Sequence, residues 1–412
     1  MGFLSGGGAG RVCRAAGGWY TSALTVQRGT VPELTIALDG AFACEPLTGS
    51  GQYTLGLWRE FSAGLSGYRF VLLRPGESER SGSRYVRKRA KLWWEQRGVI
   101  RAAREAGAVL VHVPYFAGPL HSSLPFVVTV HDVIPLVFPA YRASLAMRLY
   151  LLVVGRVVRR ASAIITDSEH SKRDIVRLLR LPGERIRAIP LAADRRFRPA
   201  DDRTRLDALR SRFGLPGPVI FNVGGLDLRK NLASLVEAFA RALPELDPTT
   251  RLVIAGRPHA ENRRLYPPLE PVIRRLGLEQ QVVLTGAVSE EDKLGLYQIA
   301  DLYVYPSLYE GFGLSVLEAM ACGTPVIAAN RSSLPEVVAD SGLLVEPEPG
   351  ALAAAISMLM RDDHLRTKLA RLARARAAEF SWERTARETV AVYHEVLVGH
   401  EALRKAGGRC AS

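Results

Sequence analysis

The distribution of apolar positions along the chain predicts two successive sets of buried strands. Short runs rich in β-branched residues recur with little alternation between apolar and polar positions, which is typical of strands buried on both faces of a parallel sheet. Segments with helical periodicity separate these runs. One of them follows Ser168, whose hydroxyl can cap a helix that begins there. The runs of the first set are residues 34–40, 108–113, 126–132 and 161–168.

The same alternation of apolar runs and helical segments begins again in the second half of the chain, and it predicts a second domain. Its apolar runs are residues 218–225, 251–256, 281–286, 301–307 and 324–329. Alternating strands and helices indicate right-handed βαβ units in doubly wound sheets. The pattern therefore predicts an α/β protein with two Rossmann-like domains that face an inter-domain cleft. We expect a disordered tail over 1–33, an N-terminal domain over 34–200 and a C-terminal domain over 201–380.

Composition supports a globular protein with large cores. Hydrophobic residues make up 48% of the 412 positions and charged residues 23%. No run approaches the roughly 18 apolar residues that a membrane span needs. Four widely spaced cysteines without a CxxC pair indicate neither a disulfide framework nor a metal site. A reducing cytoplasm is therefore the expected location.

The net charge of +14 raises the question of an anionic partner. No readable nucleic-acid motif accompanies the charge, so we expect no nucleic-acid partner. Basic residues gather over 84–104, where they are interleaved with Trp93 and Trp94. This composition suits peripheral contact with the inner face of a membrane, or an anionic substrate. A solvated helix with buried tryptophans would account for it equally well.

The segment YEGFGLSVLEAMACG, which starts at Tyr309, carries the strongest sign of chemistry. It reads as a turn followed by a helix, just past a predicted strand, where ligands bind in such sheets. Gly311 and Gly313 would let the backbone approach a ligand, and the amino end of the helix suits a phosphate. Glu310 and Glu318 could accept hydrogen bonds from sugar and ribose hydroxyls on either side of a diphosphate. The simpler alternative is a glycine turn and a solvated helix.

Other strand ends carry weaker signals. Arg229 and Lys230 follow the glycine pair that ends in Gly225, and two cations there could neutralise a diphosphate and its developing charge. They could equally be exposed residues at a helix entrance. His131 also lies at a strand end, where its neighbour Asp132 could fix its tautomer or simply turn the chain. The remaining candidates are glycines of predicted loops, Gly49, Gly51 and Gly286.

The same segments resemble a known family. LYEGFGLSVLEAMACGTPVIA is similar to the E-x7-E signature of retaining glycosyltransferases of the GT-B fold, specifically glycosyltransferase family 4. The resemblance extends over about 34–398 and includes LTGSGQYT, TVHDVIPL, VGGLDLRKNL and SSLPEVVADSGLLVEP. In detail the chain is most similar to bacterial mannosyl- and rhamnosyltransferases that build surface polysaccharides.

The resemblance assigns roles to matching positions. It implies that Glu310 contacts the donor sugar, that Glu318 contacts the ribose and that Lys230 binds the diphosphate. It also implies that His131 lies near the transferred sugar. The backbone amides of Gly311, Phe312, Gly313 and Leu314 would bind the sugar and diphosphate, and Gly49 and Gly51 would form the loop of the amino domain. Many relatives have arginine where this chain has Gly225, so Arg229 would supply that charge. Residues 381–400 resemble a closing helix that crosses back to the amino domain.

These observations predict a retaining hexosyltransferase that moves a sugar, with mannose as the first candidate, from a nucleotide sugar such as GDP-mannose to a glycan or lipid-linked acceptor. No cofactor and no metal are expected. Two alternatives remain from the residues themselves. One is a glycoside hydrolase that uses the glutamate pair as acid and base or nucleophile. The other is a non-catalytic nucleotide-binding protein of the same fold.

Overall fold

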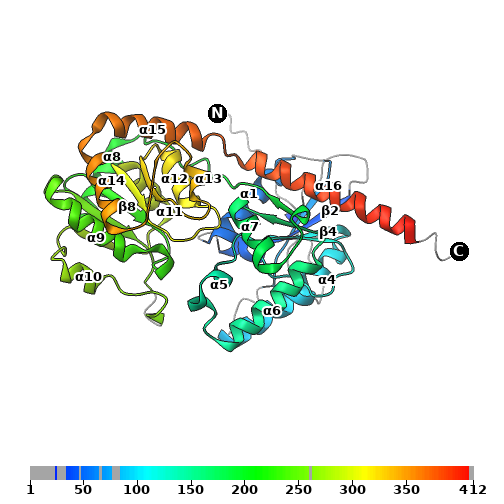
Figure 1. The fold of residues 1–412 in the computed structure, drawn as a ribbon. Coiled ribbons are helices and arrows are strands. Elements are labelled where there is room, and N and C mark those ends of the chain that lie inside the picture. The colour runs from blue at the N-terminus through cyan, green and yellow to red at the C-terminus, as the bar shows by residue number, and fades with distance from the viewer. Residues whose placement is uncertain are drawn as a thin grey trace, which may run out of the picture.

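The chain is described here by a computed structural model that covers residues 24–25, 34–45, 48–64, 67–76, 84–258 and 262–407. It forms two α/β domains that lie side by side, each built around a parallel sheet (Figure 1). The prediction of a disordered tail over 1–33 falls largely outside the described residues. Within that segment Leu24–Thr25 forms strand β1, which the prediction did not anticipate.

The N-terminal sheet has the strand order β1-β3-β2-β4-β5-β6-β7. Only the pair β1–β3 is antiparallel, and all other neighbours are parallel. Every residue of β2 and β5 is buried, as the continuous apolar runs predicted. The strand bounds are β2 (Thr35–Asp39), β3 (Arg69–Leu73), β4 (Ala108–Val113), β5 (Phe126–Thr129), β6 (Ala163–Thr166) and β7 (Ile186–Ala188).

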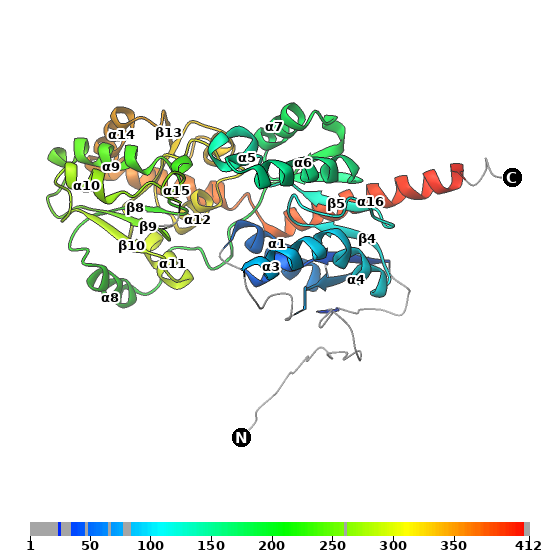
Figure 2. The ribbon, with the colours of Figure 1, turned by 90° about the horizontal axis from the view of Figure 1, so that it is seen from below.

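Helices cover both faces of this sheet. One apolar core lies between the sheet and α1, and a second lies between the opposite face and α4, α6 and α7 (Figures 1 and 2). Ser168 caps α7 by accepting a hydrogen bond from the amide of Ser171, which confirms the predicted helix start. The helices are α1 (Gly49–Ser62), α3 (Arg84–Trp93), α4 (Val99–Glu105), α5 (Ile134–Val137), α6 (Leu145–Arg160) and α7 (Glu169–Leu179).

The C-terminal sheet is fully parallel and has the order β10-β9-β8-β11-β12-β13. This is the strand order of a dinucleotide-binding fold, in which strands are added towards one edge of the sheet up to β10 and towards the other edge from β11, so the topological switch point lies between β8 and β11. All five strands predicted for this half are present. The bounds are β8 (Val219–Val223), β9 (Arg251–Ala255), β10 (Val282–Gly286), β11 (Leu302–Tyr305), β12 (Val326–Ala329) and β13 (Leu343–Val345).

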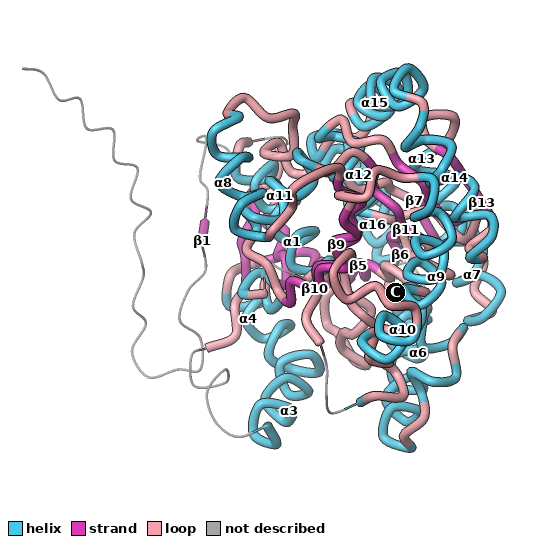
Figure 3. The backbone as a smooth tube through the Cα atoms, turned by 90° about the vertical axis from the view of Figure 1, so that its left-hand side faces the viewer, coloured by secondary structure: helices cyan, strands magenta, loops and turns pink. Residues whose placement is uncertain are grey.

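The C-terminal sheet is also enclosed by helices, as Figure 3 shows with the C-terminal domain towards the viewer. Helices α9, α10 and α14 pack on one face, and α8, α11, α12 and α15 pack on the other. Their bounds are α8 (Arg203–Phe213), α9 (Leu232–Ala242), α10 (Glu270–Arg275), α11 (Glu290–Ile299), α12 (Leu314–Cys322), α13 (Leu334–Val338), α14 (Pro349–Arg361) and α15 (Asp363–Ala377).

The last helix, α16 (Trp382–Gly407), returns to the N-terminal domain and lies along α1 (Figure 1). Trp382 packs so closely on Gly56 of α1 that a Cβ there would come within 2.6 Å of the indole. Farther along, the Tyr393 hydroxyl bonds to the ring of His112 at 2.6 Å. Helix α16 is thereby tied to the first domain. No helix in the described part of the chain has the length and apolarity to cross a bilayer.

Candidate active site

Five of the predicted site residues lie just past the carboxyl ends of β8 and β11, the two neighbouring strands on either side of the topological switch point of the C-terminal sheet. The loop after β8 carries Gly225, Arg229 and Lys230, and the loop after β11 carries Glu310 and Gly311. Such a switch point leaves a crevice into which both loops project. The sequence separation between the two loops is about 80 residues, so the fold alone brings them together.

Glu310 is the centre of this cluster. Its Oε1 accepts hydrogen bonds from Arg229 Nη1 at 2.5 Å and from Lys230 Nζ at 2.8 Å. The hydroxyls of Tyr305 and Ser307 reach the same oxygen at 3.0 and 2.5 Å. All the bonds described for this carboxylate use Oε1. Arg229, Lys230 and Glu310 are each less than 10% exposed, so the pairs form away from bulk water.

The electrostatics of the cluster follow from burial and pairing. Burial by itself would raise the pKa of Glu310, but Arg229 and Lys230 outweigh it and bring that pKa down to about 2. Burial lowers the pKa of Lys230, and the nearby Arg229 acts in the same direction against the pull of Glu310. At neutral pH Glu310 is therefore a fully ionised acceptor and a weak base.

The turn that follows Glu310 is built as predicted. Gly313 has φ +110° and precedes α12, and Gly323 ends that helix in the left-handed region with φ +79°. The side chain of Phe312 packs in the core against Phe380, so only its backbone faces the turn. Within the described residues, the amides of Gly311, Phe312, Gly313 and Leu314 donate to no other group. Free donors at a helix start are suited to binding an anion.

Gly311 also joins the two domains. A Cβ at this position would lie 2.2 Å from the carbonyl oxygen of His131, so only glycine allows this approach. The Gly311 carbonyl accepts hydrogen bonds from Ser168 at 2.7 Å and from Ser171 at 3.0 Å, both at the start of α7. The predicted sugar-binding turn is thus in direct contact with the N-terminal domain.

Three further interactions cross the cleft. The carboxylate of Glu336 accepts hydrogen bonds from the backbone amides of Glu169 and His170 at 2.9 and 2.7 Å and so caps a helix of the other domain. Tyr309 donates to Asp174 at 2.7 Å. The Tyr141 hydroxyl donates to Asp227. The structure therefore has its cleft closed around the Glu310 turn.

His131 lies at the end of β5, next to the turn, but its ring is held within its own domain. Nδ1 bonds to Asp167 Oδ2 at 2.8 Å and Nε2 to the carbonyl of Pro114 at 3.1 Å. Both partners are acceptors, so the ring binds as an imidazolium. Burial lowers the pKa of His131, but Asp167 outweighs it and the net shift is upward. Asp132 instead accepts from the amide of Ile134, so it turns the chain and Asp167 fixes the ring.

Glu318 belongs to a separate network. Its Oε1 lies 3.2 Å from Lys293 Nζ, and its Oε2 accepts from Tyr297 at 2.9 Å. Lys293 and Tyr297 are one turn apart on α11, and Lys293 also pairs with Glu290 at 3.1 Å. Burial raises the pKa of Glu318 in spite of Lys293. The two glutamates of the motif therefore have opposite electrostatic environments, which their spacing did not reveal.

The glycine candidates differ in what surrounds them. Gly51 sits in the first turn of α1, where its amide bonds to Thr48 Oγ1 and a Cβ would lie 2.0 Å from the Glu45 carbonyl. Gly49 has open space around its Cβ position. Gly225 lies beside Asp227, and a Cβ there would come 2.9 Å from its carboxylate. Tight packing against the backbone therefore explains Gly51 without a ligand, whereas the single near neighbour at Gly225 is the end of a side chain and does not by itself require glycine.

Gly286 ends β10 with φ +70° and lines a pocket of about 570 Å³ in the C-terminal domain. Leu226, Gly256, Tyr266 and Thr285 line the same pocket, which lies beyond the ends of β8, β9 and β10. Its size and its mixed apolar and polar lining suit a nucleobase with part of a ribose.

Several residues of the site were not predicted. They are the partners Tyr305, Ser307, Tyr141, Asp227, Lys293, Tyr297 and Asp167. Tyr305 ends β11 and Ser307 lies in the loop that leads to Glu310, so both could have been inferred from their proximity in sequence, whereas the others come from distant segments. No group of three or more His, Cys, Asp or Glu side chains among the described residues is arranged to hold a metal ion.

Two family models match the chain. The one described as "Glycosyl transferases group 1" covers residues 209–376, and the one described as "Glycosyltransferase Family 4" covers residues 48–197. The O-antigen chain mannosyltransferase B of Escherichia coli is 30% identical over 372 residues, which are 84% of this chain and 96% of that protein. A serotype-specific mannosyltransferase WbdA of Escherichia coli is 28% identical, but the match spans only 33% of its length.

Solved structures share the fold. Sucrose-phosphate synthase from Thermosynechococcus elongatus has a TM-score of 0.69 at 24% identity and covers 89% of this chain and 100% of its own. Anabaena HepE in complex with UDP has a TM-score of 0.67 at 20% identity, with 88% of this chain and 100% of its own covered. At these identities the likeness concerns the fold alone.

Proposed function

Because the chain belongs to glycosyltransferase family 4, in the group 1 class of the GT-B fold, we propose that it transfers a hexose from a nucleotide sugar to a glycan or lipid-linked acceptor with retention of anomeric configuration. Mannose is the first candidate, since the relative matched over nearly its whole length is named as an O-antigen mannosyltransferase. A role in cell-surface polysaccharide synthesis is proposed on the same ground.

The observation that carries this proposal is the anion site at the start of α12. The amides of Gly311 to Leu314 have no partner among the described residues, and the cations Arg229 and Lys230 lie buried beside the same turn. A diphosphate bound there would receive hydrogen bonds from the amides and charge compensation from both cations as it leaves. The base would occupy the pocket at Gly286, and Glu318 would accept from the ribose hydroxyls.

The same contacts favour one route for the acceptor proton. Glu310 has a pKa of about 2, and both ring nitrogens of His131 are already bonded to acceptors, so neither is a suitable base at neutral pH. A leaving phosphate oxygen on the same face of the sugar would then take the proton from the acceptor hydroxyl, which yields retention. Closure of the cleft would exclude water and suppress hydrolysis.

The glycosidase alternative is not favoured by these contacts. A glycosidase needs one carboxylic acid that is protonated near neutral pH. Burial raises the pKa of Glu318, but both of its oxygens are bonded to Lys293 and Tyr297, in a network separate from that of the ionised Glu310. A glycosidase also has no use for free backbone donors and two buried cations beside Glu310.

The proposal is tested by thermal stabilisation with UDP, GDP, ADP and dTDP. A diphosphate at 100 times its dissociation constant should add about 2.7 kcal/mol to the free energy of unfolding. We expect one of the four to stabilise the protein, and Glu318→Ala to lose the effect. The exposed Glu279 provides a matched control, since Glu279→Ala should keep it. No stabilisation by any of the four would contradict the proposed donor class.

The sugar and the stereochemistry need a second measurement. Incubation with the donor of the selected base and an oligomannoside acceptor should give a product whose new anomeric signal in NMR matches that of the donor. Inversion, or a trapped glycosyl-enzyme adduct, would refute the proposed mechanism.

A further inference from the structure

Helix α6 carries exposed apolar side chains that the proposed reaction does not use. Leu145, Leu149 and Leu152 are 71%, 55% and 58% exposed. Their spacing of four and three residues places them on one face of the helix. The opposite face packs into the core through Val157 and Val158. The first half of α6 therefore extends beyond the body of the domain, at the lower edge of Figure 1.

The same helix is strongly basic. Residues 133–166 contain five arginines and no aspartate or glutamate. Arg148 and Arg156 donate to backbone carbonyls of their own segment, and within the described residues none of the five forms an ion pair with a carboxylate. Their charge therefore remains available to an external partner. The five are Arg142, Arg148, Arg156, Arg159 and Arg160. We call these arginines, together with the three exposed leucines, the α6 face.

A groove of about 900 Å³ runs along this face, between α6, the turn Pro139–Arg142 and the end of α7. Its lining mixes apolar and cationic side chains, including Leu151, Leu178 and Arg159. The turn also connects the groove to the active site. Arg142 lines the groove, whereas the adjacent Tyr141 donates across the cleft to Asp227.

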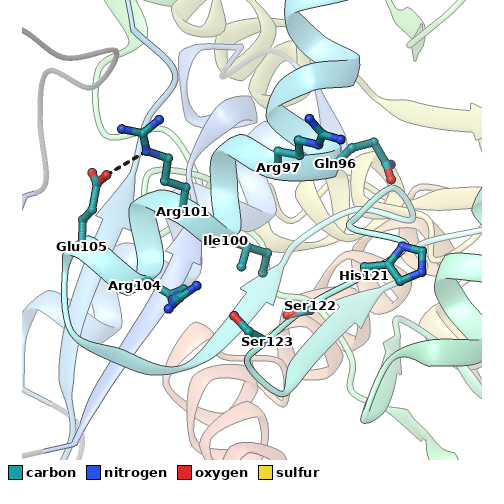
Figure 4. A pocket seen from close by; sticks show the side chains of 9 residues that line it. All are labelled: Gln96, Arg97, Ile100, Arg101, Arg104, Glu105, His121, Ser122 and Ser123. Atoms are coloured by element: carbon teal, nitrogen blue, oxygen red, sulfur yellow. Dashed lines mark hydrogen bonds and ion pairs between the residues drawn. The ribbon is translucent and has the colours of Figure 1, made fainter.

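The basic surface continues onto α4, on the same side of the sheet (Figure 2). The loop that contains Gly118 and Leu120 links the two helical segments. Arg160 of α6 donates to the carbonyl of Leu120, and Gln96, just before α4, donates to the carbonyl of Gly118. A pocket of about 800 Å³ opens there, lined by Arg97 and Arg104 of the helical segment and by His121 and Ser122 of the loop (Figure 4). The cationic surface is thus wider than α6 itself.

We propose that the α6 face docks onto an anionic phospholipid bilayer. Leucines at the projecting end would enter the acyl boundary, while the arginine stems lie along it and their guanidinium groups bind lipid phosphates. Electrostatic repulsion argues against a second copy of the chain as the partner that binds the α6 face. A twofold contact would bring five uncompensated arginines against five others. Docking in this way brings the turn Pro139–Arg142, whose Tyr141 bonds to Asp227 of the other domain, to the membrane surface.

The test is co-sedimentation of the full chain with phosphatidylcholine vesicles, with and without phosphatidylglycerol. We expect binding only to the anionic vesicles, and weaker binding at high salt. Arg148→Gln with Arg156→Gln should weaken binding about 30-fold, at about fivefold for each arginine near the surface. Leu149→Gln with Leu152→Gln should weaken it at least tenfold, because each leucine buries several methylenes.

Matched control pairs lie on other surfaces. Met358→Gln with Val398→Gln changes equally exposed apolar residues, and Arg274→Gln with Arg371→Gln changes exposed arginines of the C-terminal domain. Both controls should bind vesicles as the wild type does, and all variants should keep the wild-type melting temperature. The proposal is overturned if anionic vesicles do not bind, or if both α6 pairs bind normally. It is also overturned if neutralising Arg87, Lys88, Arg89 and Lys91 alone removes all binding, or if the leucine pair only dissociates a dimer.

Discussion

Replacing Glu310 by glutamine removes the negative charge at the centre of the buried cluster with Arg229 and Lys230. The pKa of Glu310 falls from 4.5 to about 2 because Arg229 and Lys230 outweigh the effect of burial. A downward shift of about 2.5 pH units corresponds to about 3 kcal/mol of unfolding free energy. Because the folded-state pKa is depressed, this contribution is complete above the unfolded value of 4.5 and is lost as the pH falls towards 2.

We therefore expect Glu310→Gln to unfold at lower urea concentration than the wild type. The difference in unfolding free energy should be about 3 kcal/mol at neutral pH and about 2 kcal/mol near pH 3.5. Glu318→Gln is the matched control, because burial raises the pKa of Glu318 and Lys293 would retain Glu290 as its partner. Its unfolding free energy at neutral pH should equal or exceed that of the wild type. Equal losses in the two variants would refute the electrostatic reasoning.

Three further substitutions test the contacts around the turn. Gly311→Ala places a Cβ 2.2 Å from the His131 carbonyl, so we expect the cleft to open in small-angle scattering and kcat to fall about 10²-fold. An unchanged kcat would contradict the close approach. The control is Gly399→Ala, because the Cβ position of Gly399 has open space around it. Asp167→Asn should lower the His131 pKa, followed by NMR titration, and should destabilise the protein by about 1–3 kcal/mol. Because the pKa of His131 is raised in the folded protein, the loss of unfolding free energy should be largest below pH 6.5 and should vanish as the pH rises through the folded-state pKa. A loss that does not depend on pH would contradict the ion pair. Glu336→Ala removes the carboxylate that caps α7 from the other domain. It should make the free energy of domain closure about 1–2 kcal/mol less favourable, measured as a roughly tenfold rise in KM for the donor. An unchanged KM would show that the cap does not act on closure.

The fold was largely predictable because strands of a parallel sheet are buried on both faces and leave continuous apolar runs. Nine of the strands were predicted in this way. Strands β7 and β13 were not predicted because each has only three residues, too few for a distinct apolar run. Strand β3 was not predicted either, although it is as apolar as its neighbours.

The site was predictable only where its residues are close in sequence. The glycine turn, α12 and its end at Gly323 followed from local rules for helix ends. The partners of the two glutamates did not, because Arg229 is 81 residues from Glu310 and Lys293 reaches Glu318 from another helix. Periodicity tells which face of an element is buried, but it does not tell which distant polar group satisfies a buried carboxylate.

The hydrogen bonds that cross the cleft also bear on the timing of a catalytic cycle. One domain is bound to the other through the side chains of Ser168, Ser171, Tyr141, Tyr309 and Glu336. At about 1 kcal/mol net for each bond, the open form is a small minority of molecules. Under the proposed function, a nucleotide-sugar donor would enter and a nucleoside diphosphate would leave only through that minority. The observed association rate would then be the diffusional rate multiplied by the open fraction. We therefore expect departure of the nucleoside diphosphate, rather than glycosyl transfer, to set the turnover rate.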